Sequence, residues 1–216
     1  GQLTIGATPG VSTYLLPDWL RSFRESYPQL NVALQTGVTS KNISSVMDHQ
    51  QDLAFVEGEL DKVNRKGLGH MVLRPVTMLV VVGHGHEWSK YDSVVLSDLN
   101  SQPFIMRQSN SRTRVWVDTI FNQHHVKPKV VAEFDNQEAI KQAVMSNMGV
   151  TMLPDYAIER EMSAGLLRGL SVEGVQLQRE LKLIYDATMP FTPVARVLLL
   201  SLAQLFPQLK TLVSER

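Results

Sequence analysis

Short apolar runs alternate with helical patterns along most of the chain, and this alternation constrains the fold more than any other feature. Leu3 to Ala7 alternates as a strand does, and residues 16 to 23 place their apolar side chains on one face of a helix behind Ser12 or Thr13 as N-cap. Repetition of this kind is typical of βαβ units. The sequence therefore predicts an α/β fold with a mainly parallel sheet.

The same reading continues to the end of the chain. Further strands are expected at residues 31–36, 52–56, 71–82, 104–107, 129–134, 150–153 and 181–187. Further helices are expected at residues 40–49 and 111–124, after a capping box formed by Asp135 and Glu138, and last at residues 194–206. Because proline lacks an amide for central pairing, Pro75 predicts an interruption of its strand and a domain boundary close by.

Length and charge limit the class of protein. The 216 residues suit one large core or two small ones. Lys plus Arg equals Asp plus Glu, at 21 each, so we expect no appreciable binding of this chain to duplex DNA at physiological salt. Apolar runs stay far below the roughly 20 residues that span a bilayer, so no membrane segment is expected. The chain has no cysteine, which excludes disulfides and thiolate metal sites.

The common catalytic and metal motifs are absent from the sequence. It contains no GxSxG, HExxH, SxxK, Walker loop or GxGxxG, so neither an enzyme nor a cofactor is predicted. The run from His84 to Glu87 holds two imidazoles, but glycines surround them and no third ligand lies nearby. We interpret it as a polar turn rather than a metal site.

Polar segments rich in hydroxyl and amide groups follow four of the predicted strands and open the next helix. These segments are residues 8–13, 36–42, 107–113 and 135–137. In an open sheet such segments meet at the carboxyl ends of the strands, where ligands bind, and helix N-termini present free amides to anions. The four segments together predict a small-molecule site, although each residue taken alone could equally be an N-cap.

The third segment, RQSNSRTR, adds guanidinium groups to this set. Arginine can hold a carboxylate or phosphate in two-point geometry, which favours an anionic ligand. The alternative is that Arg112 and Arg114 point to solvent from the helix surface.

Several motifs, taken in order, resemble the regulatory domain of the LysR family over nearly the whole chain. They are GQLTIGAT followed by LLPDWLRSFRESYPQL, then DLAFVEG, LSDLNSQPFIMRQSNSRTR and EFDNQEAIKQAVMSNMGVTMLP. The resemblance implies two Rossmann-like subdomains similar to type 2 periplasmic binding proteins, joined by two crossover segments, with the effector in a cleft between them. It places subdomain I at residues 1–73 plus 188–216 and subdomain II at residues 74–187. By position it assigns effector contacts to Thr8, Gly10, Thr39, Ser40, Arg107, Ser109, Ser111, Thr113 and Asn136.

The function implied is that of the effector-sensing domain of a cytoplasmic, bacterial DNA-binding regulator. A small, anionic metabolite would shift the conformation, and promoter DNA would be contacted only through an N-terminal winged helix-turn-helix that this chain lacks. The resemblance also implies a dimer of this chain and a tetramer of the full-length protein. Because the chain starts without methionine, we expect it to be a fragment or a processed product. A periplasmic solute-binding protein of a transport system is the alternative, and an enzyme on the same fold is a third.

Overall fold

The computed structural model describes residues 1–60 and 65–216, which form two compact units. Unit 1 comprises Gly1–Pro75 and Glu180–Arg216, and unit 2 comprises Val76–Arg179. The second boundary lies at residues 179 and 180, whereas the family resemblance placed it at 187 and 188. The difference arises because the strand at residues 178–186 pairs antiparallel with the strand at residues 53–57, inside unit 1.

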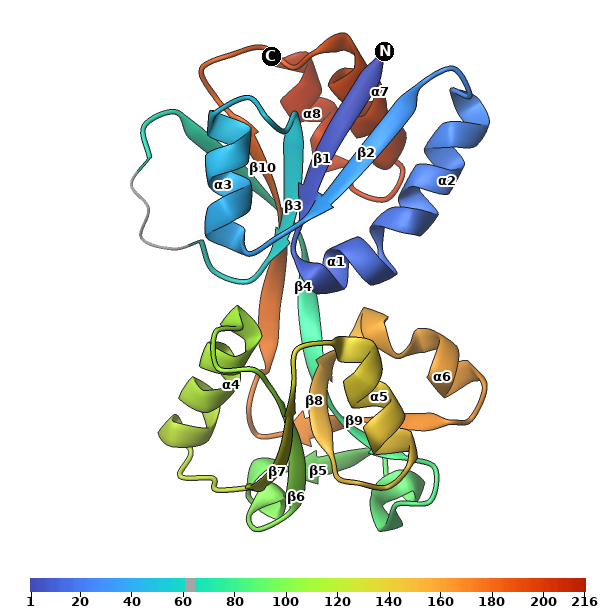
Figure 1. The fold of residues 1–216 in the computed structure, drawn as a ribbon, viewed down its shortest axis with the longest axis vertical. Coiled ribbons are helices and arrows are strands. Elements are labelled where there is room, and N and C mark those ends of the chain that lie inside the picture. The colour runs from blue at the N-terminus through green and yellow to red at the C-terminus, as the bar shows by residue number, and fades with distance from the viewer. Residues whose placement is uncertain (61–64) are drawn as a thin grey trace. The chain divides into compact units, whose positions relative to one another are not determined.

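Unit 1 is a sheet flanked by helices (Figure 1). Its elements are β1 (Gln2–Ala7), α1 (Pro9–Tyr14), α2 (Leu16–Ser26), β2 (Asn31–Thr36), α3 (Thr39–Met47), β3 (Leu53–Glu57), the first part of β4 (Leu68–Gly83), most of β10 (Gln178–Asp186), α7 (Pro193–Leu202) and α8 (Gln208–Ser214). The strand order is β2-β1-β3-β10-β4. β1 is parallel to both β2 and β3, whereas β10 is antiparallel to β3.

Unit 2 contains the rest of β4 and a second set of strands. Its elements are the 3-10 helix η1 (Glu87–Lys90), β5 (Ser93–Val95), η2 (Leu96–Leu99), β6 (Pro103–Arg107), α4 (Arg112–Gln123), β7 (Lys129–Phe134), α5 (Gln137–Met145), β8 (Thr151–Pro154), η3 (Asp155–Ala157), α6 (Glu159–Ser163) and β9 (Leu167–Glu173). β4 pairs antiparallel with both β8 and β9. β5 pairs parallel with β9, and β6 pairs parallel with β7. The α/β class is confirmed, but the sheet is mixed rather than mainly parallel.

Several expected boundaries are wrong for local reasons. Ser12 and Thr13 lie inside α1 and cap no helix, because Pro9 already starts the chain turning at the first helical position. β4 runs unbroken through Pro75, which is the last residue of the first segment of unit 1. The predicted capping box is absent: Asn136, not Asp135, caps α5, by accepting a hydrogen bond from the amide of Ala139. The helix expected to be last ends at Leu202, and α8 follows it.

The core of unit 1 forms around aromatic and aliphatic side chains of its sheet. Leu3, Ile5 and Phe55 have no exposed surface. Trp19 on α2 packs edge-on against Phe55 of β3 at 5.4 Å and against Phe206 at 5.5 Å, which fixes α2 to the sheet.

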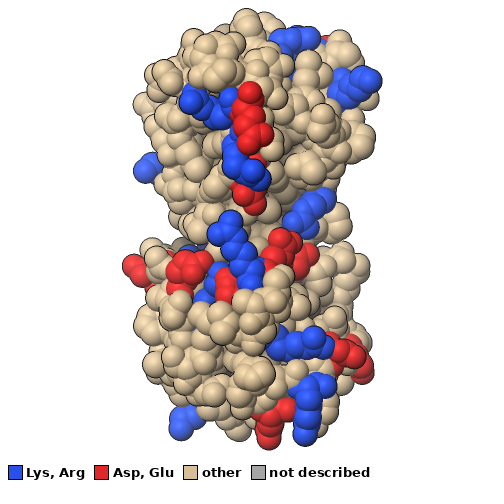
Figure 2. Space-filling view, turned by 90° about the vertical axis from the view of Figure 1, so that its right-hand side faces the viewer, with Lys and Arg blue, Asp and Glu red and all other residues tan. Residues whose placement is uncertain are grey.

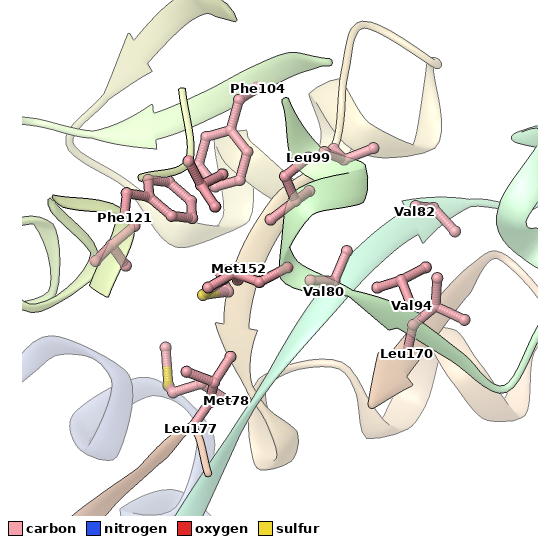
Figure 3. Close-up of a cluster of buried hydrophobic side chains, with 14 of the residues drawn as sticks. Met78, Val80, Val82, Val94, Leu99, Phe104, Phe121, Met152, Leu170 and Leu177 are labelled. Carbon is pink, nitrogen blue, oxygen red and sulfur yellow. The ribbon is translucent and has the colours of Figure 1, made fainter. Parts of the chain in front are cut away.

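The core of unit 2 is a separate cluster (Figure 3). Phe104 of β6 and Phe121 of α4 meet edge to face at 5.4 Å. Met152 of β8 and Val80 of β4 belong to the same buried cluster. Because Phe104 lies three residues before Arg107, this packing also fixes the end of β6 that carries the polar segment.

The His84–Glu87 run forms a turn, as expected. The Nδ1 atom of His86 accepts a hydrogen bond of 3.0 Å from the amide of Trp88 and so caps η1. Among residues 1–60 and 65–216, no group of three or more His, Cys, Asp or Glu side chains is arranged to hold a metal ion.

This cap predicts a pH dependence of stability. Burial lowers the pKa of His86 below 6.5, its ordinary value. The unfolded chain therefore binds this proton first, so the contribution of His86 to the free energy of unfolding is complete above pH 6.5 and falls as the pH drops towards the folded-state pKa. Urea denaturation across this range should show that slope. The slope should be smaller in His86→Asn, because asparagine keeps the cap but does not titrate. In His124→Asn the slope should be unchanged. An identical slope in His86→Asn would contradict the assignment.

Candidate functional site

Unit 1 brings two of the predicted residues to the carboxyl edge of its sheet. Thr8 follows β1, and its Oγ1 accepts a hydrogen bond of 3.1 Å from the amide of Glu57 at the end of β3. Thr39 is the first residue of α3, which begins just beyond β2. Ser12 and Thr36 join the same edge through a hydrogen bond of 2.6 Å between their hydroxyls.

The start of α3 is held in place by Asn42. Its Nδ2 donates to the carbonyls of Gly37 at 2.8 Å and Val38 at 3.2 Å. Gly6 in β1 makes this packing feasible, because a Cβ there would lie 2.3 Å from Oδ1 of Asn42. The glycine in β1 therefore leaves room for the side chain that holds the start of α3.

Thr39 carries the most informative atom of unit 1. The residue is only 1% exposed, and within the described part of the chain its buried Oγ1 has no hydrogen-bond partner. A buried hydroxyl without a partner costs free energy, about 1 to 3 kcal/mol, and such groups call for an explanation. A ligand oxygen or nitrogen beside the N-terminus of α3 would provide one.

The other two predicted residues of unit 1 differ in exposure. Ser40, the second residue of α3, is exposed. Gly10 is buried in the first turn of α1. The structure assigns neither residue a role, so their predicted effector contacts stay predictions.

In unit 2, Arg107 ends β6 and is 8% exposed. Its Nε donates to Oε1 of Gln108 at 3.2 Å. Its carbonyl accepts a hydrogen bond of 2.8 Å from Nη1 of Arg114. The same Nη1 pairs with Glu133, and Nε of Arg114 pairs with Asp118. The side chain of Arg114 is 17% exposed. Arg114 therefore stabilises the polar segment at residues 107–113. The alternative that its side chain points to solvent is wrong.

Two predicted residues of unit 2 have the N-cap role. The hydroxyl of Ser111 accepts from the amide of Arg114 at 3.4 Å and opens α4. Asn136 caps α5 in the same way. Both are satisfied locally, so the structure supports the N-cap interpretation for them. Ser109 is exposed, and its predicted contact stays a prediction.

Arg179, which contacts Thr113, is a residue that the sequence analysis did not predict. The Oγ1 of Thr113 accepts a hydrogen bond of 3.1 Å from Nη1 of Arg179, which is 7% exposed and stacks over Trp116 at 5.8 Å. Arg179 lies on the same face of the strand as buried Leu177 and Leu181, so a charged residue at an inward strand position was the available signal. Unit 2 thus holds two buried guanidinium groups near the start of α4 and the end of β6.

Basic and acidic residues balance in number, at 21 each. On the face seen in Figure 2, basic and acidic side chains are interspersed rather than gathered by sign. No helix among the described residues is long and apolar enough to cross a membrane.

Comparison with known proteins identifies relatives over nearly the whole chain. The family model of the LysR substrate binding domain matches residues 1–207. A "Probable RuBisCO transcriptional regulator" of Guillardia theta is 33% identical over 187 residues, covering 85% of this chain and 60% of the relative. The transcriptional activator CmpR of Synechocystis is 31% identical over 209 residues, covering 93% of this chain and 68% of the relative. The chain thus spans about three fifths to two thirds of these relatives.

Solved structures share the fold. The regulatory domain of CcmR from Synechocystis PCC6803, in complex with 2-PG, has a TM-score of 0.83 at 23% identity and covers 95% of this chain and 97% of its own. The effector binding domain of QuiR in complex with shikimate has a TM-score of 0.77 at 19% identity, with 98% of both chains covered.

The curated relatives are transcriptional regulators, which favours that interpretation over a transport protein. The family match covers both units, including every segment that carries a predicted site residue. This chain belongs to the LysR substrate-binding domain family.

Proposed function

We propose that this chain is the effector-sensing domain of a LysR-type transcriptional regulator. A small anionic metabolite binds at the polar segments that follow the strands and changes the conformation of the domain. A DNA-binding domain outside this chain responds to that change. The protein acts in the cytoplasm, and this chain itself performs no catalysis.

The observation that carries the proposal is the buried Oγ1 of Thr39, which has no partner among the described residues, at the start of α3. The N-terminus of a helix favours negative charge, and a hydroxyl beside it can donate to an anion. Arg107 supplies a nearly buried guanidinium in unit 2. The relatives add support, since the CcmR and QuiR domains are described with 2-PG and shikimate bound.

Self-association is part of the same proposal. A dimer of this chain and a tetramer of the longer protein are what the family resemblance implies. Contact with promoter DNA is assigned to a domain beyond these residues, because basic and acidic residues balance at 21 each in this chain.

A thermal-shift screen of small metabolites tests the proposal. An anion that binds at a hundredfold excess over its Kd should stabilise the chain by about 2.7 kcal/mol. For a chain of this size that corresponds to a rise in Tm of roughly 5 to 11 °C. 2-PG and shikimate belong in the panel, each with an uncharged analogue as control. A panel in which amines or neutral compounds stabilise this chain while anions do not would contradict the anionic class. Turnover of any stabilising compound would favour the enzyme alternative.

A further inference from the structure

A pocket within unit 1 lies away from Thr8 and Thr39. It is lined by the end of α3, the start of β3, the end of β10 and the segment before α7, namely Val46, His49, Gln51, Asp52, Tyr185, Asp186, Met189, Pro190, Phe191 and Thr192. α3 begins just beyond the carboxyl end of β2 (Figure 1). Its last turn contributes Val46 to the pocket. The pocket therefore occupies the opposite edge of the sheet from Thr39. The volume of the cavity is about 160 Å³.

The carboxylate of Asp186 is fixed in one wall of the pocket. It accepts hydrogen bonds from the amide of Thr188 at 2.8 Å, from the hydroxyl of Thr188 at 2.6 Å, and from Nε2 of His49 at 2.9 Å. His49 follows α3 with a φ of 60°, a conformation that costs a non-glycine residue about 1 kcal/mol or more. These bonds lower the pKa of Asp186, with Thr188 contributing most, so the carboxylate remains charged at neutral pH.

The loop behind this wall is tied down by Arg216. Its Nη2 donates to the carbonyls of Ala187 at 2.8 Å and Met189 at 2.6 Å. Its guanidinium stacks on the rings of Tyr185 at 5.1 Å and Phe191 at 5.5 Å. The pocket is thus held open by bonds within unit 1 and needs no ligand to keep its form.

The chemistry of the lining selects one class of ligand. Asp52 and Asp186 bring two carboxylates, and none of the lining residues is a lysine or arginine. The guanidinium of Arg216 lies against the rings of Tyr185 and Phe191, where its Nη2 is engaged by the carbonyls of the loop. Asp52 is anchored at the start of β3, where its Oδ2 accepts from the amide of Thr4 at 2.8 Å. Val46, Met189 and Phe191 add apolar surface beside these charges. Carboxylates next to apolar walls repel anions and attract an ammonium group attached to an apolar body.

We propose that this pocket binds a small organic cation, a primary ammonium on an apolar body about the size of one ring. The ammonium donates to the carboxylates of Asp52 and Asp186, and the apolar body packs against Val46 and Phe191. This site is separate from the segments assigned to the anionic effector, so a cationic molecule could modulate the domain independently.

Three matched probes test the proposal on the whole chain by NMR titration. Phenethylamine, 2-phenylethanol and phenylacetate share one ring and differ in charge. We expect phenethylamine to shift the amides of Asp52, Asp186 and Phe191 while leaving Thr39 and Ser40 unmoved. The alcohol should bind at least about tenfold more weakly, because it lacks the charge-assisted hydrogen bond.

Substitution of Asp52 completes the test. In Asp52→Asn the amide oxygen can still accept from Thr4, so the fold should persist while phenethylamine affinity drops about tenfold and the alcohol is unaffected. Asp18→Asn, an exposed position on α2, is the matched control. Equal affinity for amine and alcohol, unchanged amine affinity in Asp52→Asn, or shifts confined to Thr39 and Ser40 would each overturn the proposal. If phenethylamine does not bind this pocket, the result of the anion screen still stands, because that screen tests binding at different residues.

Discussion

Replacing Lys141 by methionine is expected to lower the free energy of unfolding by about 3 to 5 kcal/mol. Lys141 on α5 is 2% exposed. Its Nζ donates to the carbonyl of Ala157 at 2.7 Å and to Glu138 at 3.0 Å, and it forms a short ion pair with Glu161 on α6. One ammonium therefore joins α5, η3 and α6. Removing it leaves the carboxylate of Glu161, whose side chain is 15% exposed, without its cation.

Urea denaturation followed by circular dichroism measures this loss. The double variant Lys141→Met, Glu161→Leu should recover part of the stability, because apolar residues of similar volume often replace a buried pair at little cost. Lys127→Met, at an exposed position, should change stability by at most about 0.5 kcal/mol. A loss below about 1 kcal/mol in Lys141→Met would show that this ion pair does not stabilise unit 2.

Sequence patterns predicted the positions of the strands better than the pairing between them. The strands at residues 31–36 and 129–134 were placed at the bounds that the structure has, because alternation and apolar runs are local signals. The antiparallel pairing of β10 with β3 was missed, since it joins residues more than 120 positions apart. No local pattern records which strand lies beside which.

The candidate site was predictable only in part, for a similar reason. Helix-opening segments after strands are visible in sequence, and Thr8 and Thr39 do lie at one sheet edge. Whether such a residue caps a helix depends on its φ and ψ angles and on one hydrogen bond, and these are known only from the structure. Ser111 and Asn136 accept that hydrogen bond, whereas Oγ1 of Thr39 has no partner among the described residues. Arg179 escaped notice because its partner, Thr113, is 66 residues away.

Arg107→Ala is expected to weaken binding of an anionic effector by roughly tenfold to more than a hundredfold. This range corresponds to about 1.5 to 3 kcal/mol for the loss of a charge-assisted hydrogen bond. The carbonyl of Arg107 still accepts from Arg114 in this variant, so the course of the loop should be retained. Arg160→Ala, at an exposed position on α6, is the control that removes a cation from unit 2 without touching the segment. Loss of affinity in both variants alike would assign the effect to net charge.

Calorimetric titration of Thr39→Val beside Arg107→Ala, with the anion that stabilises the chain most, tests the account most directly. Valine matches threonine in shape and removes an Oγ1 that has no partner in the described chain, so Tm should stay level or rise. Affinity should nevertheless drop about fivefold, because a neutral hydrogen bond to the ligand, worth about 1 kcal/mol, is lost. Thr8→Ala should lose affinity by a similar factor. Unchanged affinity in all of these variants, with any loss confined to Tm, would contradict the effector site.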